Sequence, residues 1–190
     1  AEAHAVGLSA AIWNGSGSGR PTGMVNTAPT TGEDNASPTR SHEAFQYVPM
    51  TATSSPFTTN GVGTDDVIDL VYALNPRLRG GARFSANTTT QGHLRKLKDS
   101  NGQYLWQPSL QAGQPDRLIG YEMFTWEEMG DPTTANALPI AFGDFSKAYT
   151  LATRQEMNVL VDPYATKGYT AFFIDRRYGG IVTNNSALKF

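Results

Sequence analysis

The second half of the chain consists of short apolar runs separated by turn residues, and this spacing limits the fold more than any other feature. Runs of Val, Ile, Thr, Tyr and Phe between Gly, Pro, Asn and Asp residues are typical of β-strands. The runs at 157–161 and 169–177 are joined by D-P-Y-A-T-K-G, which predicts a β-hairpin. Strands are expected at Ala82–Asn87, Tyr121–Trp126, Pro139–Phe142, Lys147–Thr153, Met157–Val161, Tyr169–Arg177 and Ile181–Thr183.

Three helices are expected before and between these strands. The clearest begins at Thr64 and runs to about Arg79, with three aspartates near its positive N-terminal end. Pro76 should end or kink it near Asn75, because proline lacks an N–H group and clashes with the preceding turn. Its apolar stripe consists of Val67, Ile68, Val71, Leu74 and Leu78, and the other helices are expected at Ala1–Trp13 and from Asn87 or Thr88 to about Lys98. This order of elements, without an internal repeat, predicts an α+β fold.

The composition agrees with a chain of strands and long loops. Apolar residues make up 39% and charged residues 17%, both below the usual share of a globular domain, while the chain holds 19 Gly and 11 Pro. Residues 15–64 are rich in turn sequences, with short strands expected only at Met24–Asn26 and Phe45–Val48. Aromatic residues reach 11%, too many for a disordered chain, and 190 residues are enough for one or two cores.

Charge and residue content exclude several classes of protein. A net charge of −2 gives no general attraction to nucleic acid, and the absence of cysteine excludes disulfides, thiolate nucleophiles and Cys-ligated zinc. No apolar run approaches the roughly 18 residues that span a membrane. The chain starts without Met inside an expected helix, and residues 1–13 lack the basic leading segment of a signal peptide. We therefore expect a C-terminal fragment of a processed or proteolysed protein.

Several residues could bind a ligand or take part in catalysis, but none of them has the spacing that such chemistry requires. The G-S-G-S-G run at 15–19 lacks the lysine and the flanking strand and helix of a phosphate loop, so it is interpreted as a connector. The three histidines, His4, His42 and His93, are far apart and lack metal-ligand spacing. The aspartates of the first helical turn are explained by the helix dipole. We expect no catalytic residue, no cofactor and no metal.

An acidic loop beside Trp126 leaves one alternative open. Glu127, Glu128 and Asp131 lie between Gly and Pro residues, and with Trp106 and Trp126 they would suit a β-rich glycan-binding or hydrolase domain. A glycosidase needs two carboxyls held about 5–10 Å apart across a cleft. Adjacent loop residues do not indicate such a pair, and the sequence has neither a recognisable Ser–His–Asp pattern nor a G-x-S-x-G elbow.

Residues 94–113 have the character of a contact surface. A basic helix end is followed by a D-S-N-G turn and then by Tyr104, Leu105 and Trp106, which follow no helical or strand period. A loop with large aromatics and no catalytic group suits contact with another protein, although these aromatics and Tyr164 could instead fold back as additional core. Two further contact candidates end a strand and are interpreted as solvated or inter-subunit ion-pair residues, Arg176 and Arg177.

Several motifs occur in an order that points to one family. R-K-L-K-D-S-N-G-Q-Y-L-W-Q-P-S-L-Q-A-G (95–113) is followed by L-I-G-Y-E (118–122). Further along are I-A-F-G-D-F-S-K-A-Y (140–149), N-V-L-V-D-P-Y (158–164) and R-R-Y-G-G-I-V-T-N-N-S-A-L-K-F (176–190), and W-N-G-S-G-S-G-R-P-T-G-M (13–24) precedes them all. Together they span nearly the whole chain, and they resemble the major capsid proteins of tailed bacteriophages.

The resemblance implies the Hong Kong 97-like capsid fold, with mixed sheets, few helices, a peripheral P-domain and an axial A-domain. Residues 1–60 and 145–177 would form the P-domain, and residues 61–144 and 178–190 the A-domain. The family's N-terminal arm, E-loop and most of its spine helix would be missing, so the fragment alone should assemble poorly or only into capsomer-like rings. The Lys–Asn crosslink of some members is not expected, because the hairpin with Lys167 has no Asn.

The resemblance also implies where copies of the chain touch. It places residues 98–114 near the capsomer axis and the hairpin at 162–168 around the three-fold positions. The expected axial contacts are Lys98, Asp99, Asn101, Tyr104, Leu105, Trp106, Gln107 and Gln111, and those of the hairpin are Asp162, Tyr164 and Lys167.

In function, the resemblance implies a structural subunit without enzyme activity. Identical copies would form pentamers and hexamers of an icosahedral shell around double-stranded DNA, which they would hold without sequence-specific contact. A portal and a scaffold or protease are further expected partners, and a membrane is not. The location would be the virion capsid, assembled in the cytoplasm of a bacterial host, with an encapsulin or a gene transfer agent shell as the alternative.

Overall fold

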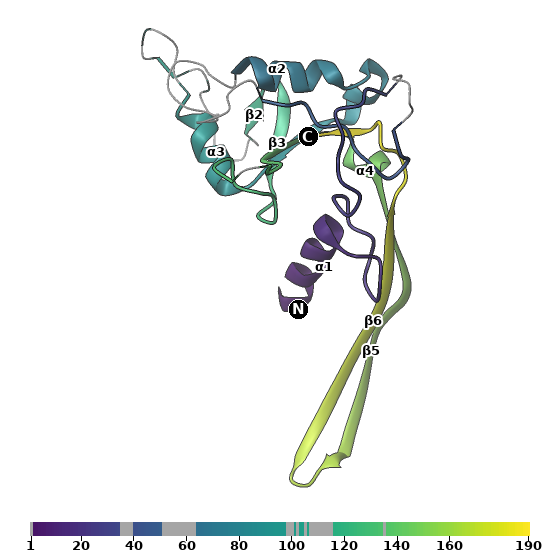
Figure 1. Cartoon of the computed structure of the whole chain (residues 1–190). Helices are drawn as coiled ribbons and strands as arrows, with labels where there is room; N and C mark the ends of the chain where they lie inside the picture. The colour runs from purple at the N-terminus through teal and green to yellow at the C-terminus, as the bar shows by residue number, and fades with distance from the viewer. Residues whose placement is uncertain are drawn as a thin grey trace.

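A long two-stranded hairpin projects from a body built of short helices and a five-stranded sheet (Figure 1). The computed structural model describes residues 2–34, 40–50, 64–97, 101, 103–104, 106, 116–134 and 136–190. The helices are α1 (Glu2–Asn14), α2 (Thr64–Ala73), the 3-10 helix η1 (Pro76–Gly81), α3 (Thr88–Arg95) and α4 (Phe145–Ala148). The strands are β1 (Arg83–Ala86), β2 (Arg117–Leu118), β3 (Tyr121–Thr125), β4 (Ile140–Gly143), β5 (Tyr149–Thr166), β6 (Tyr169–Val182) and β7 (Leu188–Lys189). The predicted α+β class is confirmed.

The helix boundaries follow from breaking and capping residues. α2 stops before Asn75 and η1 begins at Pro76, as predicted from the missing N–H group of proline. The Asn75 side chain accepts a hydrogen bond from the Arg77 N–H at 3.0 Å. Asn87 caps α3 by accepting a hydrogen bond from the Thr90 N–H at 2.7 Å.

The body sheet has the strand order β2-β3-β1-β4-β7, in which β1 runs parallel to β3 and antiparallel to β4. Phe84 of β1 lies opposite Phe142 of β4, with their ring centroids 4.5 Å apart. Directly paired side chains share one face of a sheet, and Val67, Leu70, Val71 and Leu74 of α2 cover the face that carries these rings. Ile68, which was predicted to belong to the apolar stripe, is 38% exposed. The resulting first core contains Val67, Leu70, Val71, Leu74, Ala82, Phe84, Ala86, Leu94, Leu97, Trp106, Leu118, Met123, Ile140 and Phe142.

A second core lies on the other side of β4 and joins segments far apart in the sequence. Trp13 of α1 packs edge-on against Trp126 and Phe190, with centroid distances of 5.3 and 5.6 Å. Phe45 packs against the same Phe190 ring at 5.5 Å. The cluster therefore fixes α1 against the body, and its members are Trp13, Met24, Phe45, Met129, Ala141, Ala148, Tyr149, Val182, Ala187, Leu188 and Phe190.

The prediction of two short strands in the N-terminal third is wrong. Residues 24–26 and 45–48 lie outside every strand, and only Gln46 forms isolated bridges, to Thr30 and Lys189. The Met24 and Val25 N–H groups instead donate to carbonyl oxygens in the last turn of α1. The apolar residues that suggested a strand are thus used to end a helix and fill the second core.

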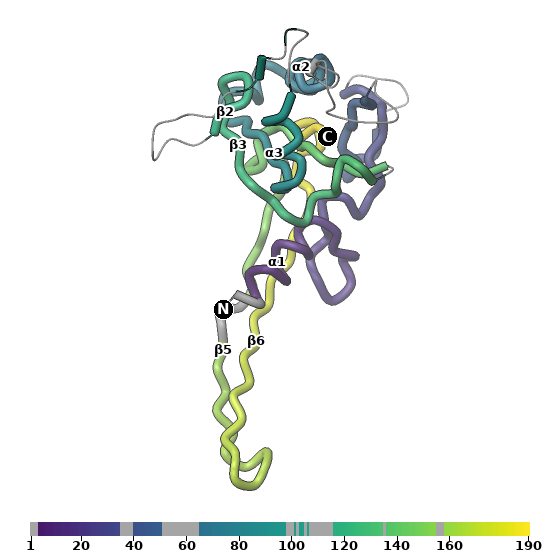
Figure 2. The backbone as a smooth tube through the Cα atoms, turned by 90° about the vertical axis from the view of Figure 1, so that its left-hand side faces the viewer, coloured from purple at the N-terminus to yellow at the C-terminus, as the bar shows by residue number. Residues whose placement is uncertain are grey.

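The hairpin is longer and more continuous than predicted. β5 is one 18-residue strand where two were expected, because register shifts within its pairing to β6 take up the extra residues. β6 continues through Gly179 and Gly180, which pair with Ala152 and Leu151, so the strand expected at 181–183 is the end of β6. Along the distal half of the hairpin, no other described element lies beside β5 and β6 (Figure 1, Figure 2).

Gly143 shows how closely β4 and the C-terminal segment approach, and it provides a first prediction. A Cβ atom at this position would lie 2.1 Å from the Ala187 carbonyl oxygen, which also accepts a hydrogen bond from the Asp144 N–H. Gly143→Ala is therefore expected to lower the free energy of unfolding by about 1–3 kcal/mol, measured by urea denaturation. Gly92→Ala in α3 has open space around its Cβ, so it should leave stability unchanged or raise it by up to about 1 kcal/mol. Equal stability of the two variants would contradict this account.

Candidate self-association surface

The distal part of the hairpin, residues 158–175, carries exposed apolar side chains on both faces, and we call it the distal arm. In the register, Val159 lies opposite Ile174 and Val161 opposite Phe172, which places these four on one face. Leu160 and Phe173 lie opposite each other on the other face, and all six side chains are 49–65% exposed. An isolated two-stranded hairpin is only marginally stable in water, and contiguous exposed apolar surface marks a protein contact.

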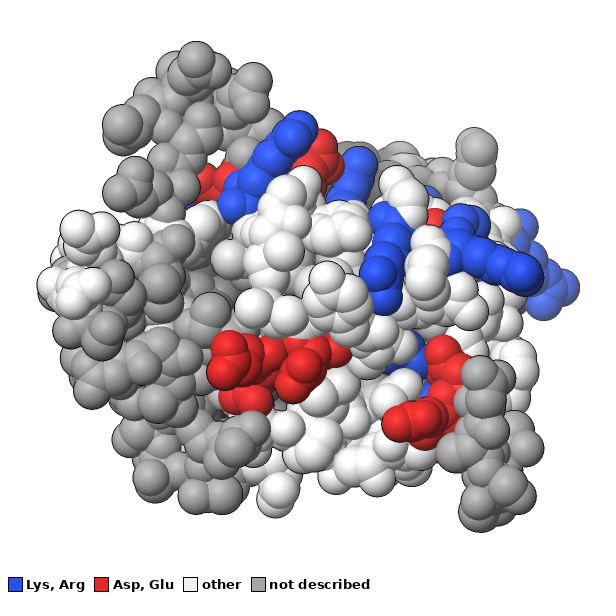
Figure 3. Space-filling model, turned by 90° about the horizontal axis from the view of Figure 1, so that it is seen from above, with Lys and Arg blue, Asp and Glu red and all other residues white. Residues whose placement is uncertain are grey.

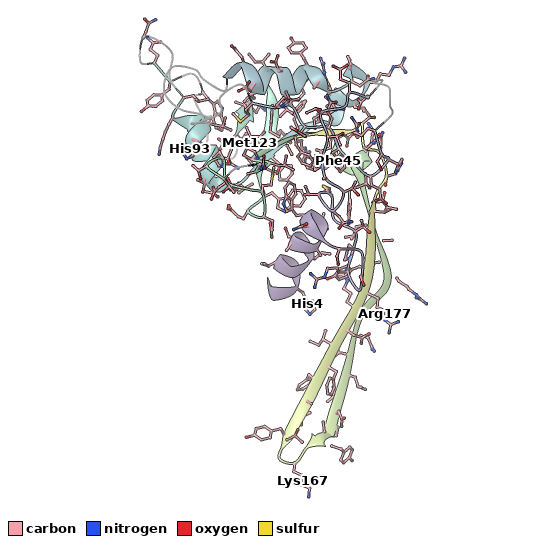
Figure 4. All side chains as sticks on the ribbon, in the orientation of Figure 1. His4, Phe45, His93, Met123, Lys167 and Arg177 are labelled. Atoms are coloured by element: carbon pink, nitrogen blue, oxygen red, sulfur yellow. The ribbon has the colours of Figure 1, made fainter. Side chains whose placement is uncertain are left out.

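The three predicted hairpin residues come together at the tip of the distal arm. Asp162 accepts a hydrogen bond from the Tyr164 N–H at 2.8 Å, which orders the turn. Tyr164 is 91% exposed, and Figure 4 shows Lys167 at the far end of the hairpin. The tip therefore presents an aromatic ring and a cation as far from the body as the chain reaches. Arg176 and Arg177 lie farther back on β6, and both are exposed.

The expectation that Trp106 projects from the surface is wrong. Its side chain belongs to the first core and is 8% exposed. The indole Nε1 donates a hydrogen bond to the Arg117 carbonyl oxygen at 2.7 Å, and the Arg95 guanidinium lies 5.4 Å from the ring centroid. Burial of a large apolar ring is favourable when its one N–H donor has a hydrogen-bond partner. The sequence around Trp106 has no periodic pattern that would have indicated this burial.

The rest of the predicted axial loop is described only in part. Tyr104 is 55% exposed, and Asn101 is also exposed. The other predicted loop residues lie outside the described residues: Lys98, Asp99, Leu105, Gln107 and Gln111. The axial assignment of the loop therefore stays a prediction.

The buried indole provides a second prediction. Trp106→Phe keeps an aromatic ring in the core but removes the donor to the Arg117 carbonyl oxygen. The free energy of unfolding should fall by about 1–2 kcal/mol, measured by chemical denaturation. Tyr164→Phe at the exposed tip serves as the control and should change it by less than about 0.5 kcal/mol. A Trp106→Phe variant as stable as the wild type would show that the indole is not bound in this way.

A buried ionic network that the sequence reading missed ties the C-terminal strand to the N-terminal loop. The Lys189 ammonium is fully buried, and it donates to Asp34 Oδ1 at 2.5 Å and to Gln46 Oε1 at 2.8 Å. Arg40, whose side chain is 3% exposed, donates to the same Asp34 oxygen at 2.6 Å and to the Gly32 carbonyl oxygen. One carboxylate therefore holds two buried cations. Asp34 and Lys189 are 155 residues apart in the sequence, and no sequence motif connects them.

The network makes the stability of the fold depend on pH in the acid range. Burial alone would raise the pKa of Asp34, but the hydrogen bonds from Lys189 and Arg40 outweigh it and hold that pKa below the ordinary value of 3.8. A lowered carboxyl pKa stabilises the fold fully above the ordinary pKa, and this stabilisation is lost as pH falls through the folded pKa. For the Lys189 ammonium, burial has the opposite effect and lowers the pKa.

A third prediction follows for unfolding measured against pH. The difference in unfolding free energy between the wild type and Asp34→Asn should be constant near neutrality and shrink as pH falls from about 5 to about 2. Urea denaturation of both proteins at several pH values measures it. A difference that stays constant to the acid end would mean that the Asp34 carboxylate does not stabilise the fold through these cations.

The acidic loop at 127–131 has a structural role. The Glu127 carboxylate accepts hydrogen bonds from the Thr88 hydroxyl and N–H, and Asp131 accepts one from Asn87. Both carboxylates thus hold the loop against the start of α3. Among the described residues no group of three metal-ligating side chains is found, and no helix there is long and apolar enough to cross a membrane.

Comparison with known proteins identifies the fold. The chain matches the Phage capsid family over residues 1–190. Two solved capsids of a GTA particle, one empty and one native and both computed with C5 symmetry, share 37% identity with it at a TM-score of 0.84. Each match covers 99% of this chain and 61% of the GTA chain, so this chain spans less than two thirds of their length. No curated protein matches the chain.

A third solved structure extends the likeness to a more distant sequence. A chain of Gordonia phage Cozz matches at a TM-score of 0.53 and 15% identity, over 98% of this chain and 59% of that one. At this identity the likeness concerns the fold alone. The expected capsid fold is confirmed, and the match over every residue shows that the chain belongs to the phage capsid family.

Proposed function

We propose that the protein is a structural subunit of an icosahedral capsid, in which identical copies form pentamers and hexamers around double-stranded DNA. The observation that carries the proposal is the distal arm, with apolar side chains exposed on both faces of a hairpin that the body does not cover. Family membership and the C5 symmetry of the two GTA capsids support it. Its function is repeated self-association, without catalytic activity of its own.

The arm suits the type of contact that closes a ring. In a ring, one face of each subunit meets a different face of the next, so an arm on one copy must dock on the body or arm of another. Burial of the six arm side chains would supply the hydrophobic part of that contact. We place the tip residues Asp162, Tyr164 and Lys167 at the three-fold positions and the loop with Asn101 and Tyr104 near the capsomer axis.

The first core supports an axial domain, whereas the second core joins the two proposed domains. The buried residues of the first core all lie within 67–142, inside the range 61–144 assigned to the A-domain, and Val48 and Met50 pack against them from outside that range. The second core combines residues from both proposed domains, and β5 and β6 extend from it. We assign the arm with α1 to the P-domain, and we propose the virion capsid as the location, with assembly in the cytoplasm of a bacterial host.

The identity of the particle is open between two related shells. At 37% identity, both the phage or prophage capsid and the gene transfer agent (GTA) shell fit the sequence. In either case the DNA would lie inside without sequence-specific contact, and a portal and a scaffold or protease would complete the assembly.

Sedimentation and electron microscopy of the full gene product test the proposal. We expect closed shells or five- and six-membered rings. A protein that stays monomeric at high concentration, under conditions in which it is folded, would contradict the proposed function.

A further inference from the structure

Four exposed arginines lie on the hairpin or on the turn beside its base, and we call them the arginine belt; none of them forms an ion pair with a described residue. They are Arg20, Arg154, Arg176 and Arg177. The five ion pairs found among the described residues use other cations, and no described hydrogen bond involves these four side chains. Arg77 of η1, on the body, is also exposed and forms no ion pair with a described residue. The clustering, rather than the lack of partners alone, sets the belt apart.

The fold brings the belt together from three segments. The turn carrying Arg20 is closed by the pairing of Ser16 with Thr22, and the Thr22 N–H donates to the Gly180 carbonyl oxygen of β6 at 3.0 Å. Arg154 falls at a register shift of β5, just before the residue that pairs with Arg177. A bulge of this kind re-aims its side chain.

The belt therefore reaches both faces of the hairpin. Consecutive strand residues point to opposite faces, so Arg176 and Arg177 face in opposite directions. Figure 4 shows Arg177 midway along the hairpin, at the level of the N-terminal part of α1.

We propose that the arginine belt binds carboxylates on a neighbouring copy of this chain, an inference that rests on the proposed function. Guanidinium groups match the planar geometry of carboxylates through paired hydrogen bonds. The apolar distal arm begins one pair beyond the belt: Asn158 pairs with Asp175 next to Arg176, and Val159 pairs with Ile174 after it. Arginine beside apolar and aromatic side chains is the composition of a protein interface.

A second copy supplies the complementary charge. Asp65 and Asp69 of α2 are exposed, and no ion pair involves them within the described part of the chain. Figure 3 shows acidic side chains in several groups on the face that carries α2, some of them beside basic side chains. Each copy thus offers both signs of charge on different surfaces, which is what a head-to-tail contact in a ring requires.

Charge reversal tests the belt. The full gene product with Arg176→Glu and Arg177→Glu should give about tenfold fewer particles than the wild type, or fewer still, because like charges would face each other. Its circular dichroism should be unchanged. The matched control, Arg77→Glu on the body, should assemble as the wild type does. Particles at wild-type yield from the double variant would overturn the inference.

A zero-length crosslink identifies the partner. Arg177→Lys keeps the positive charge and provides an amine that a carbodiimide joins to a carboxylate in direct contact. Mass spectrometry of mixed isotope-labelled particles should show Lys joined to an Asp or Glu of another copy. Crosslinks confined to one subunit would overturn the inference, as would a charge-reversed variant that assembles normally but packages less DNA. If the wild type forms no particle at all, the proposed function itself fails.

Discussion

Replacing Val161 and Phe172 with aspartate is expected to abolish assembly while leaving the subunit folded. The two side chains lie opposite each other on one face of the distal arm and are 51% and 65% exposed, and neither belongs to a core. In a shell they would be buried against a neighbour, where an unpaired carboxylate costs several kcal/mol. Every copy in a ring carries this cost, so no closed particle should form.

The particle yield by sedimentation and electron microscopy measures the effect, and circular dichroism with thermal unfolding checks the fold. The matched control is Val161→Ile with Phe172→Leu, which keeps the surface apolar and should assemble at close to the wild-type yield. Normal particles from the aspartate variant would show that this face of the arm is not an interface. Loss of the folded body in that variant would show instead that the arm stabilises its own subunit.

Asp34→Asn is expected to destabilise the fold by about 3–5 kcal/mol, because it removes the carboxylate that both buried cations contact. A loss of this size is a large part of the total stability of a domain. Since the network joins the N-terminal loop to β7, the second core should loosen with it. Chemical denaturation measures the free energy of unfolding.

Lys189→Met is the matched control, since it removes one buried charge and keeps Asp34 paired with Arg40. It should cost only about 1–3 kcal/mol, mainly because Gln46 loses its donor. The order of the two effects is the decisive result. If Lys189→Met were as damaging as Asp34→Asn, packing around the lysine chain rather than the shared carboxylate would hold the segments together.

Local signals in the sequence predicted much of the fold. Pro76 ends a helix and Asn87 caps one through effects that act within a few residues, so both were visible without the tertiary structure. The turn D-P-Y-A-T-K-G likewise predicted the hairpin that became the candidate interface. The family motifs then gave the overall architecture.

Features that depend on distant contacts were not predictable in this way. Trp106 has no periodic neighbours, and its burial depends on a carbonyl oxygen 11 residues away and on α2. Lys189 looks like an exposed terminal charge, yet Asp34 and Gln46 enclose it from more than 140 residues away. The continuity of β5 depends on bulges, and a bulge has no sequence signature strong enough to be read in advance.

A cryo-electron microscopy reconstruction of the particle made by the full gene product is the most direct test of self-association through the arm. The account predicts five- and six-fold capsomers in which Val161, Phe172 and the neighbouring apolar side chains are buried against another copy. A reconstruction in which the distal arm touches only its own subunit or remains in solvent would contradict it.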